Sequence, residues 1–279
     1  MAEKKGKGGK GGFDPTTLLG ILIGTGLIIQ GIVGSGDIMN FYDVPSIVIV
    51  VGGTFASVIA SYPFDMLKEL PKHTKILFQA GKYKPDTVIN QLEEMAQLAR
   101  KEGLLALEEK AKEIDDPFFK QGIMMVVDAV EETKTREMLE SQMENIAQRH
   151  EEAAGLYDKA AAFGPAFGMI GTLVGLINML KDMDAEGGSD SLGANMSVAM
   201  ITTFYGCILA NVFFMPIAKK LRIRNEEELL YCQIIVDGIL SIQSGDNPKF
   251  LKEKLISHLT KKDQERLMGG GKKGKKGKE

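Results

Sequence analysis

The sequence predicts an all-α integral membrane protein with four transmembrane helices and a helical cytoplasmic domain. The chain has 279 residues and a net charge of only −3, but its charges are strongly segregated. At about 1.5 Å of rise per residue, an uncharged helix of about 20 residues crosses a bilayer core. No alternating apolar pattern predicts a strand. Four windows of sufficient length contain no charged residue: 15–36, 44–64, 160–180 and 191–218.

The N-terminal residues 1–14 form a basic arm of lysines among glycines, which we expect to be flexible and cytoplasmic. No small-residue cleavage site follows the next apolar run, so the sequence predicts an uncleaved first transmembrane helix at 15–36. Asp14 and Pro15 are typical of a helix start, because proline is tolerated in the first turn.

The distribution of lysine and arginine predicts the orientation in the membrane. The connection that precedes the second transmembrane helix, 44–63, contains Asp37 and Asp43 but no basic residue. The connection between the last two transmembrane helices holds a single lysine among four acids. The basic arm, the segment 64–159 and the Gly/Lys-rich tail at 269–279 lie on the other side. Since basic loops stay in the cytoplasm, we expect both termini to be cytoplasmic.

The segment 64–159 has the apolar periodicity of several helices and no strand pattern, so we expect a helical cytoplasmic domain. Thr135 is placed to cap a long helix. No helix breaker separates Thr135 from Gly164, so this helix is predicted to continue into the third transmembrane helix, 160–180.

The fourth transmembrane helix, 191–218, is also predicted to run on beyond Pro216 into the polar sequence. We expect residues 219–268 to form cytoplasmic C-terminal helices. The tail at 269–279 is almost entirely glycine and lysine, a composition that predicts disorder.

The third transmembrane helix is not a simple apolar anchor. Gly164 with Gly168, and Gly171 with Gly175, form two small-xxx-small pairs. Such pairs allow neighbouring helix backbones to approach closely. Thr172 adds a hydroxyl near the middle of the membrane. The sequence therefore predicts that this helix is packed in a bundle with one face toward a polar group.

None of the four windows contains an ionisable side chain. Ion-driven membrane machines need an ionisable or coordinating group within the bilayer. This chain offers only hydroxyls and backbone, so any carboxylate on an ion path must come from another chain. The alternative is a structural scaffold whose threonines bond only to their own helices. The candidate hydroxyls are Thr172, Thr202 and Thr203.

Other function classes find no support in the sequence. Cys207 and Cys232 are isolated, which predicts neither a disulfide framework nor a metal site. No Gly-rich phosphate loop and no nucleophile paired with a base is present, so we expect no enzyme activity and no cofactor. The small net charge gives no reason to expect nucleic-acid binding. The three histidines lack ligand spacing: His73, His150 and His258.

The predicted cytoplasmic domain contains one distinctive motif, RKEGLLALEE at 100–109. Arg100 and Lys101 precede a glycine-interrupted apolar turn, and Glu108 and Glu109 follow it. The simplest interpretation of such charges is a solvated helix surface.

Taken together, these segments resemble the MotA/PomA family, the A subunits of the bacterial flagellar stator. The resemblance covers nearly the whole chain, and its four motifs occur in the family's order. They are DVPSIVIVVGGTFAS at 43–57, RKEGLLALEE at 100–109, GPAFGMIGTLVGL at 164–176 and MITTFYGCILANVFFMPIA at 200–218.

The resemblance implies an ion-conducting complex in the cytoplasmic membrane that converts ion-motive force into torque. Five A subunits would surround the transmembrane helices of two B subunits, which would supply the ion-carrying aspartate. Pro165 and Pro216 correspond to the family's functional prolines at the inner mouth. The charges that would engage the rotor protein FliG are Arg100 and Glu108, with Lys101 and Glu109 as accessory charges.

The resemblance also bears on the transported ion. Thr172 and Thr203 match pore threonines of sodium-type members, so sodium is favoured over the proton. Two alternatives remain at this stage. One is an ExbB/TolQ-type energiser, which would have three transmembrane helices and a long cytoplasmic tail; the other is a scaffold that conducts no ions.

Overall fold

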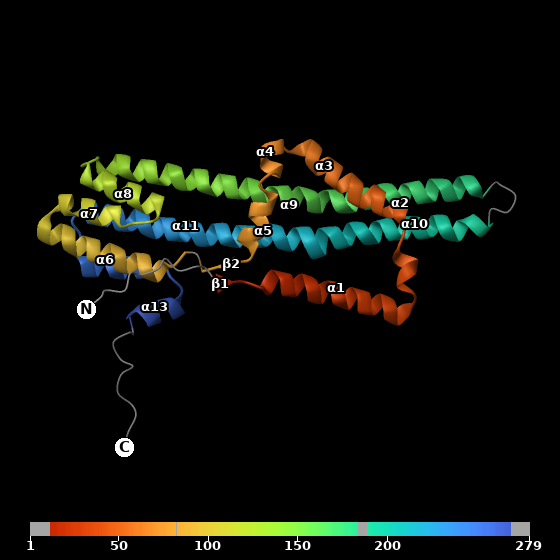
Figure 1. Cartoon of the computed structure of the whole chain (residues 1–279), viewed down its shortest axis with the longest axis horizontal. Coiled ribbons are helices and arrows are strands. Elements are labelled where there is room, and N and C mark those ends of the chain that lie inside the picture. Colours follow the sequence, from red (N-terminus) through yellow and green to blue (C-terminus); the bar gives the residue numbers. More distant parts are fainter. Residues whose placement is uncertain (1–11, 82, 184–188, 269–279) are drawn as a thin grey trace, which may run out of the picture. The chain divides into compact units, whose positions relative to one another are not determined.

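The computed structural model describes residues 12–81, 83–183 and 189–268 (Figure 1). Most of the predicted basic arm and the whole tail at 269–279 lie outside these residues. The chain divides into two compact units. We call Met1–Ala80 with Arg149–Arg224 the span unit, and Gly81–Gln148 with Asn225–Glu279 the polar unit.

The span unit begins with α1 (Thr16–Ser35) and the short 3-10 helix η1 (Ile38–Phe41). A continuous helical run follows, and two short helices complete the N-terminal half. The run consists of α2 (Val44–Ile47), the π-helical segment η2 (Val48–Gly52) and α3 (Gly53–Ser61); the short helices are α4 (Phe64–Leu67) and α5 (Leu70–Leu77).

Two long helices contribute to both units. The first is α9 (Glu132–Asp182). The second begins as α10 (Ser189–Ile208), passes through the π-helical segment η4 (Leu209–Phe214) and continues as α11 (Met215–Gln243). The predicted continuation of the polar helices into the third and fourth apolar windows is therefore confirmed.

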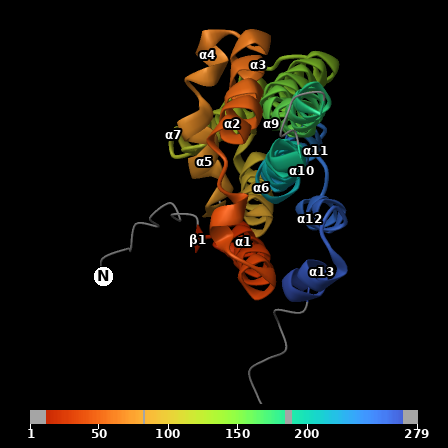
Figure 2. The same cartoon turned by 90° about the vertical axis from the view of Figure 1, so that its right-hand side faces the viewer.

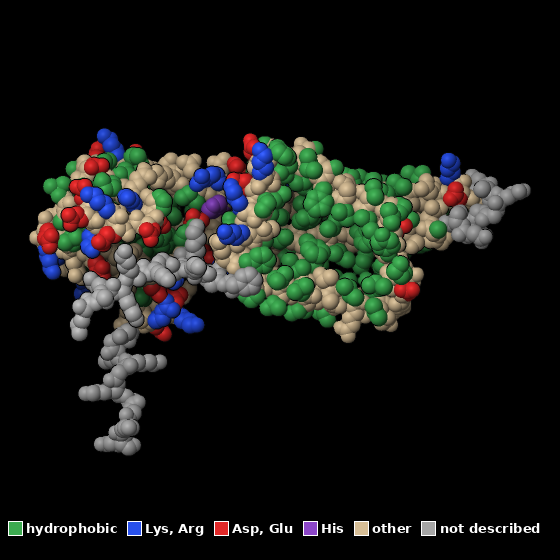
Figure 3. Space-filling model, viewed as in Figure 1, with side chains coloured by type: hydrophobic (Ala, Val, Ile, Leu, Met, Phe, Trp, Pro, Cys, Tyr) green, Lys and Arg blue, Asp and Glu red, His purple; other side chains and the backbone are tan. Residues whose placement is uncertain are grey.

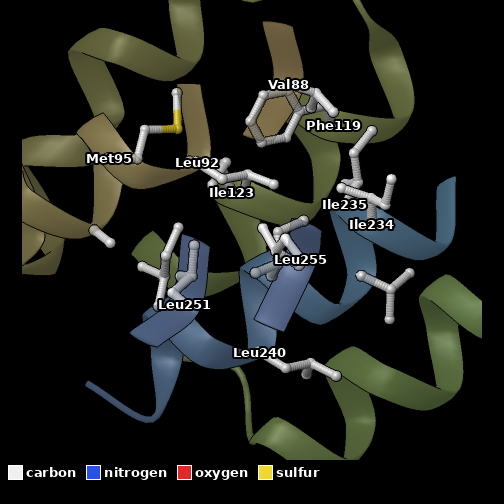
Figure 4. Packing of buried hydrophobic residues seen from close by; sticks show 14 of the residues in the cluster. Val88, Leu92, Met95, Phe119, Ile123, Ile234, Ile235, Leu240, Leu251 and Leu255 are labelled. Atoms are coloured by element: carbon white, nitrogen blue, oxygen red, sulfur yellow. The ribbon is translucent and has the colours of Figure 1, made fainter. Parts of the chain in front are cut away.

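The polar unit is a helical bundle around its own hydrophobic core. The core takes side chains from α6 (Pro85–Glu102), α8 (Pro117–Val127), α11 and α12 (Pro248–Ile256), which point toward one another in Figure 4. Leu92, Phe119, Ile235 and Leu255 are each at most 1% exposed. The shorter elements η3 (Leu104–Ala106), α7 (Leu107–Lys112) and α13 (Lys261–Met268) also belong to this unit.

Four helical stretches of the described chain are long and apolar enough to cross a membrane: Thr16–Ser35, Val44–Ser61, Glu132–Asp182 and Leu192–Gln243. Hydrophobic side chains cover much of the span unit on the face seen in Figure 3. In water such a surface would be unfavourable, whereas lipid tails solvate it. The predicted fold class, an all-α membrane protein with four transmembrane helices, is confirmed.

Helices α9 and α10 lie side by side and antiparallel (Figures 1 and 2). Their glycines make the contact, since a Cβ atom on Gly168 would lie 3.0 Å from the Thr202 carbonyl oxygen. One on Gly175 would lie 2.6 Å from the Asn195 carbonyl oxygen. The prediction that these glycines allow close helix packing is confirmed.

Three features differ from the sequence-based expectation. A two-residue antiparallel pair joins β1 (Gly12–Phe13) to β2 (Gln79–Ala80), although no strand was predicted, because two residues are too few to show alternation. Thr135 does not cap α9. The first helical bond runs from the Thr135 N–H to the Glu131 carbonyl, so Thr135 lies inside the helix with its side chain buried. The π-helical segments η2 and η4 also had no sequence prediction.

Candidate functional site

The structure brings together two of the three predicted ion-path threonines. Thr172 lies in α9 and Thr203 in α10, and their hydroxyl oxygens are 2.7 Å apart. The Thr172 hydroxyl also lies 2.9 Å from the Ala199 carbonyl oxygen of α10 and 3.0 Å from the Gly168 carbonyl oxygen of its own helix. The pair is partly open, because Thr203 is exposed and Thr172 is half-buried in the single chain.

The close contact of the two helices explains this arrangement. Thr202 turns into the interface and is fully buried, and a Cβ atom on Gly171 would lie 2.3 Å from its methyl carbon. Because Thr202 and Thr203 are adjacent in a helix, packing one into the interface directs the other toward the edge of the contact. Thr202 therefore serves packing: its hydroxyl donates to α10's own carbonyls, Val198 or Ala199.

The site offers oxygen atoms and no charge. The Ala199 carbonyl oxygen is within 3.3 Å of the hydroxyls of Thr172, Thr202 and Thr203. Each hydroxyl has one proton to donate and two lone pairs, so lone pairs remain available once its proton is placed. Hydroxyl and carbonyl oxygens are the ligands of hard cations. Within the described residues, no group of three His, Cys, Asp or Glu side chains could hold a metal ion.

The two predicted prolines occupy different surroundings. Pro165 lies inside α9 at a close contact between that helix and α10. A Cβ atom on Gly206 would lie 2.6 Å from the Gly164 carbonyl oxygen and 3.1 Å from the Pro165 Cα. Since proline has no N–H, the Ala161 carbonyl loses its usual helical donor at this crossing.

Pro216 is the second residue of α11, and this helix directly follows the π-helical segment η4. It lines an open groove between α1 and this part of the long helix, together with Gly20, Gly24 and Val212. Proline removes the N–H that would bond to the Val212 carbonyl, and a π-helical turn is one way to accommodate such a break. Both prolines therefore lie where the hydrogen-bond ladder of a long helix is weakened.

An ionic cluster that the sequence did not predict holds α1 to α11. The Asp14 carboxylate accepts hydrogen bonds from Lys220 Nζ at 2.6 Å and from Arg224 Nη2 at 2.5 Å. All three side chains are at most 16% exposed. Asp14 also accepts from the hydroxyl and the N–H of Thr16, the first residue of α1. The hydrogen bond from Lys220 is the main reason that the pKa of Asp14 is well below its usual range.

A second ionic cluster joins α9 to α11. Arg222 donates hydrogen bonds to the Glu151 carboxylate from Nε, at 3.1 Å to each oxygen, and from Nη2 at 2.5 Å, and it also contacts Asp158. The guanidinium lowers the pKa of Glu151. Because these side chains are 32–55% exposed, solvent screens the attraction, and we assign the cluster a modest positioning role.

The charges of the RKEGLLALEE motif lie in the polar unit. Arg100 and Lys101 are in the last turn of α6, and Glu108 and Glu109 are in the first turn of α7. These positions complement the helix dipoles. All four side chains are exposed, and Glu108 forms a 3.0 Å ion pair with Lys112. The motif therefore presents both signs of charge at one corner of the bundle.

Comparison with known proteins identifies relatives over most of the chain. Residues 110–234 match the model of the MotA/TolQ/ExbB proton channel family. The chain is 40% identical to Motility protein A of Borreliella burgdorferi, over 81% of this chain and 86% of that protein. It is 38% identical to chemotaxis protein PomA of Vibrio alginolyticus, over 88% and 96%. The structure is similar to that of the flagellar MotAB stator complex from Bacillus subtilis, with a TM-score of 0.82 and 31% identity over 91% of this chain and 99% of that chain.

Proposed function

Since this chain belongs to the MotA/TolQ/ExbB proton channel family and is an A subunit of a flagellar stator, we propose how its residues take part in torque generation. It is a multi-pass membrane protein of a family of ion-channel subunits, and its relatives are motility proteins of the stator type. The alternative of an ExbB/TolQ-type energiser with three transmembrane helices does not fit its four apolar helices.

In this proposal, five copies surround the transmembrane helices of two B subunits in the inner membrane. The MotAB complexes among the structural relatives support a B-type partner. The partner supplies an aspartate, because the four apolar windows of this chain contain no ionisable side chain. Both termini and the polar unit face the cytoplasm, in agreement with the distribution of lysine and arginine.

The single observation that supports an ion path is the pair of hydroxyls at Thr172 and Thr203, 2.7 Å apart. A sodium ion that loses its hydration shell needs several oxygen ligands, and this pair with the Ala199 carbonyl offers three. A proton needs only the carboxylate. We therefore favour sodium as the transported ion.

Coupling to movement would use Pro165 and Pro216. A helix with a missing hydrogen bond bends at lower cost, so a change of charge in the path could alter the angle of α9 or α11 there. The A ring would then turn around the B dimer, and Arg100, Lys101, Glu108 and Glu109 would contact the rotor protein FliG.

Co-purification tests the proposal most simply. The chain is expressed with a B-type partner from the same genome, extracted in mild detergent, and its subunits are counted by native mass spectrometry. We expect a stable complex of five A and two B chains. A chain that purifies alone and leaves the partner in a separate fraction would contradict the stator assignment.

A further inference from the structure

Leu105 is the most exposed large hydrophobic side chain in the described part of the protein, at 75%. By comparison, the apolar helices of the span unit reach 66% at Met200. Leu105 lies in the polar unit, among charged side chains, where a lipid-facing role does not apply. Single exposed leucines are common on protein surfaces, so exposure alone assigns nothing.

The local backbone holds Leu105 outward. Gly103 ends α6 with φ +89°, a left-handed conformation that favours glycine, and the 3-10 turn η3 follows at once. In a 3-10 turn, residues three apart lie on the same side. Leu104 therefore packs against the core of the unit together with Leu107, which is fully buried. Leu105 projects from a different side of this anchored turn.

Charges of both signs bracket Leu105. Arg100 and Lys101 precede it at the end of α6, and Glu108 and Glu109 follow it at the start of α7. The turn thus presents one apolar side chain flanked by charges. Protein interfaces commonly combine an apolar centre with a polar rim, and a few central residues supply most of the affinity.

A hollow lies beside the same turn. A half-open cleft of about 380 Å³ lies between α6 and α7, with Lys101 in its lining. Met95, Leu98 and Ile114 give its wall an apolar part, and Glu94 and Lys110 belong to its charged lining. The corner therefore offers a projecting apolar side chain and a cleft able to receive one.

We propose that Leu105 is the apolar anchor of the contact between this chain and the rotor protein, with the four motif charges acting as its rim. The inference rests on the proposed function. The partner that fits is a protein surface with an apolar pocket ringed by charges of both signs. Nucleic acid and anionic lipid fit poorly, because their single sign of charge would meet Glu108 and Glu109 unfavourably.

An apolar anchor is needed because exposed ion pairs contribute little to the binding free energy, whereas burial of a leucine side chain contributes substantially more. Charges fix orientation and the rate of encounter, and an apolar anchor slows dissociation. A contact that transmits force must persist while the load acts on it, and an apolar anchor lengthens that time.

The test uses the full complex of this chain with its B-type partner in nanodiscs, and purified FliG as the probe. The dissociation constant is measured by biolayer interferometry for the parent and for Leu105→Ala, Leu105→Met and Met138→Ala. Met138 is the matched control, because it is 48% exposed in the polar unit and lies outside the motif. Co-purification of the partner verifies that each variant assembles.

We expect Leu105→Ala to weaken binding about 10- to 100-fold, because the variant no longer buries a leucine side chain in the contact. Leu105→Met and Met138→Ala should stay within about threefold of the parent. Equal binding by the parent and Leu105→Ala, or an equal loss in Met138→Ala, would overturn this inference alone. A parent complex that forms but does not bind FliG would overturn the rotor contact itself.

Discussion

The hydroxyl oxygens of Thr172 and Thr203 lie 2.7 Å apart, although the residues are 31 positions apart in the chain. This contact exists because the glycines of α9 allow its backbone to approach α10 closely. The glycine pairs and the threonines are thus one structural unit: the glycines set the helix distance, and that distance brings the hydroxyls together.

The first prediction concerns this helix contact. A Cβ atom on Gly206 would lie 2.6 Å from the Gly164 carbonyl oxygen, so Gly206→Ala must push α9 and α10 apart. We expect a loss of about 1–3 kcal/mol, typical of overpacking. Gly193→Ala is the control in the same helix, because no atom lies within 4 Å of a Cβ atom there. Thermal unfolding of the purified complexes gives the comparison; equal melting temperatures would contradict the packing account.

The second prediction concerns Asp14 and its dependence on pH. The folded-state pKa of Asp14 is depressed, mainly by the hydrogen bond from Lys220, below an unfolded value of about 4. A depressed carboxyl pKa stabilises the fold fully above the unfolded pKa, and this stabilisation is lost as the pH falls through the folded pKa. Asp14→Asn should therefore destabilise the complex by about 1–3 kcal/mol at neutral pH.

The difference between Asp14→Asn and the parent should be constant from about pH 5 to 8 and should shrink below about pH 4. Asp65→Asn serves as the control, because the Asp65 side chain is 91% exposed and forms its ion pair with Lys68, three residues away. Melting temperatures across this pH range provide the measurement. A difference that grew toward acid pH would show that the sign of the linkage is wrong.

The third prediction concerns the rotor charges. Because exposed ion pairs contribute about 0–1 kcal/mol each, neutralising Arg100 or Glu108 alone should reduce torque only partly. Reversal of both charges should reduce it more, whereas assembly and membrane insertion should be unaffected. Rotation of tethered cells under load measures the torque. Unchanged torque in the double reversal would remove these residues from the rotor contact.

The fourth prediction concerns orientation. In a Cys207→Ser background, single cysteines at 37–42 or 184–190 should react with an impermeant maleimide added to intact cells. Cysteines at 90–150 should react only after lysis. Cys232 can remain, because its thiol is buried and burial raises its pKa to about 12. Labelling of 90–150 in intact cells would contradict the proposed topology.

The sequence predicted those features that depend on composition and local spacing. The uncharged windows predicted the four apolar helices, and the glycine spacing of the third window predicted close packing against a neighbouring helix. The structure identifies this neighbour as α10. The juxtaposition of Thr172 and Thr203 could only be expected from the family resemblance, because it depends on the register between two helices. Nothing local distinguishes Thr203 from Thr202, which packs into the interface instead.

The ion pairs between distant residues were not predicted from the sequence. The sequence identified Asp14 as part of a helix start. Its partner Lys220 lies 206 positions away, and nothing in the sequence around either residue indicates that they form an ion pair. The outward orientation of Leu105 was also hidden, because LLAL in the motif is uniformly apolar. The positive φ at Gly103 and the 3-10 turn decide which of these leucines is buried.

Sodium dependence of torque tests the central claim most directly. Motility is measured against external sodium in a strain whose only stator contains the parent chain, Thr172→Ala or Thr54→Ala. Thr54 is the control, since its hydroxyl donates at 2.6 Å to the Val50 carbonyl of its own helical run. We expect the parent to need sodium, Thr172→Ala to need about tenfold more or to lose torque, and Thr54→Ala to resemble the parent. A parent that swims equally well without sodium, and slows when the proton gradient is dissipated, would contradict the account.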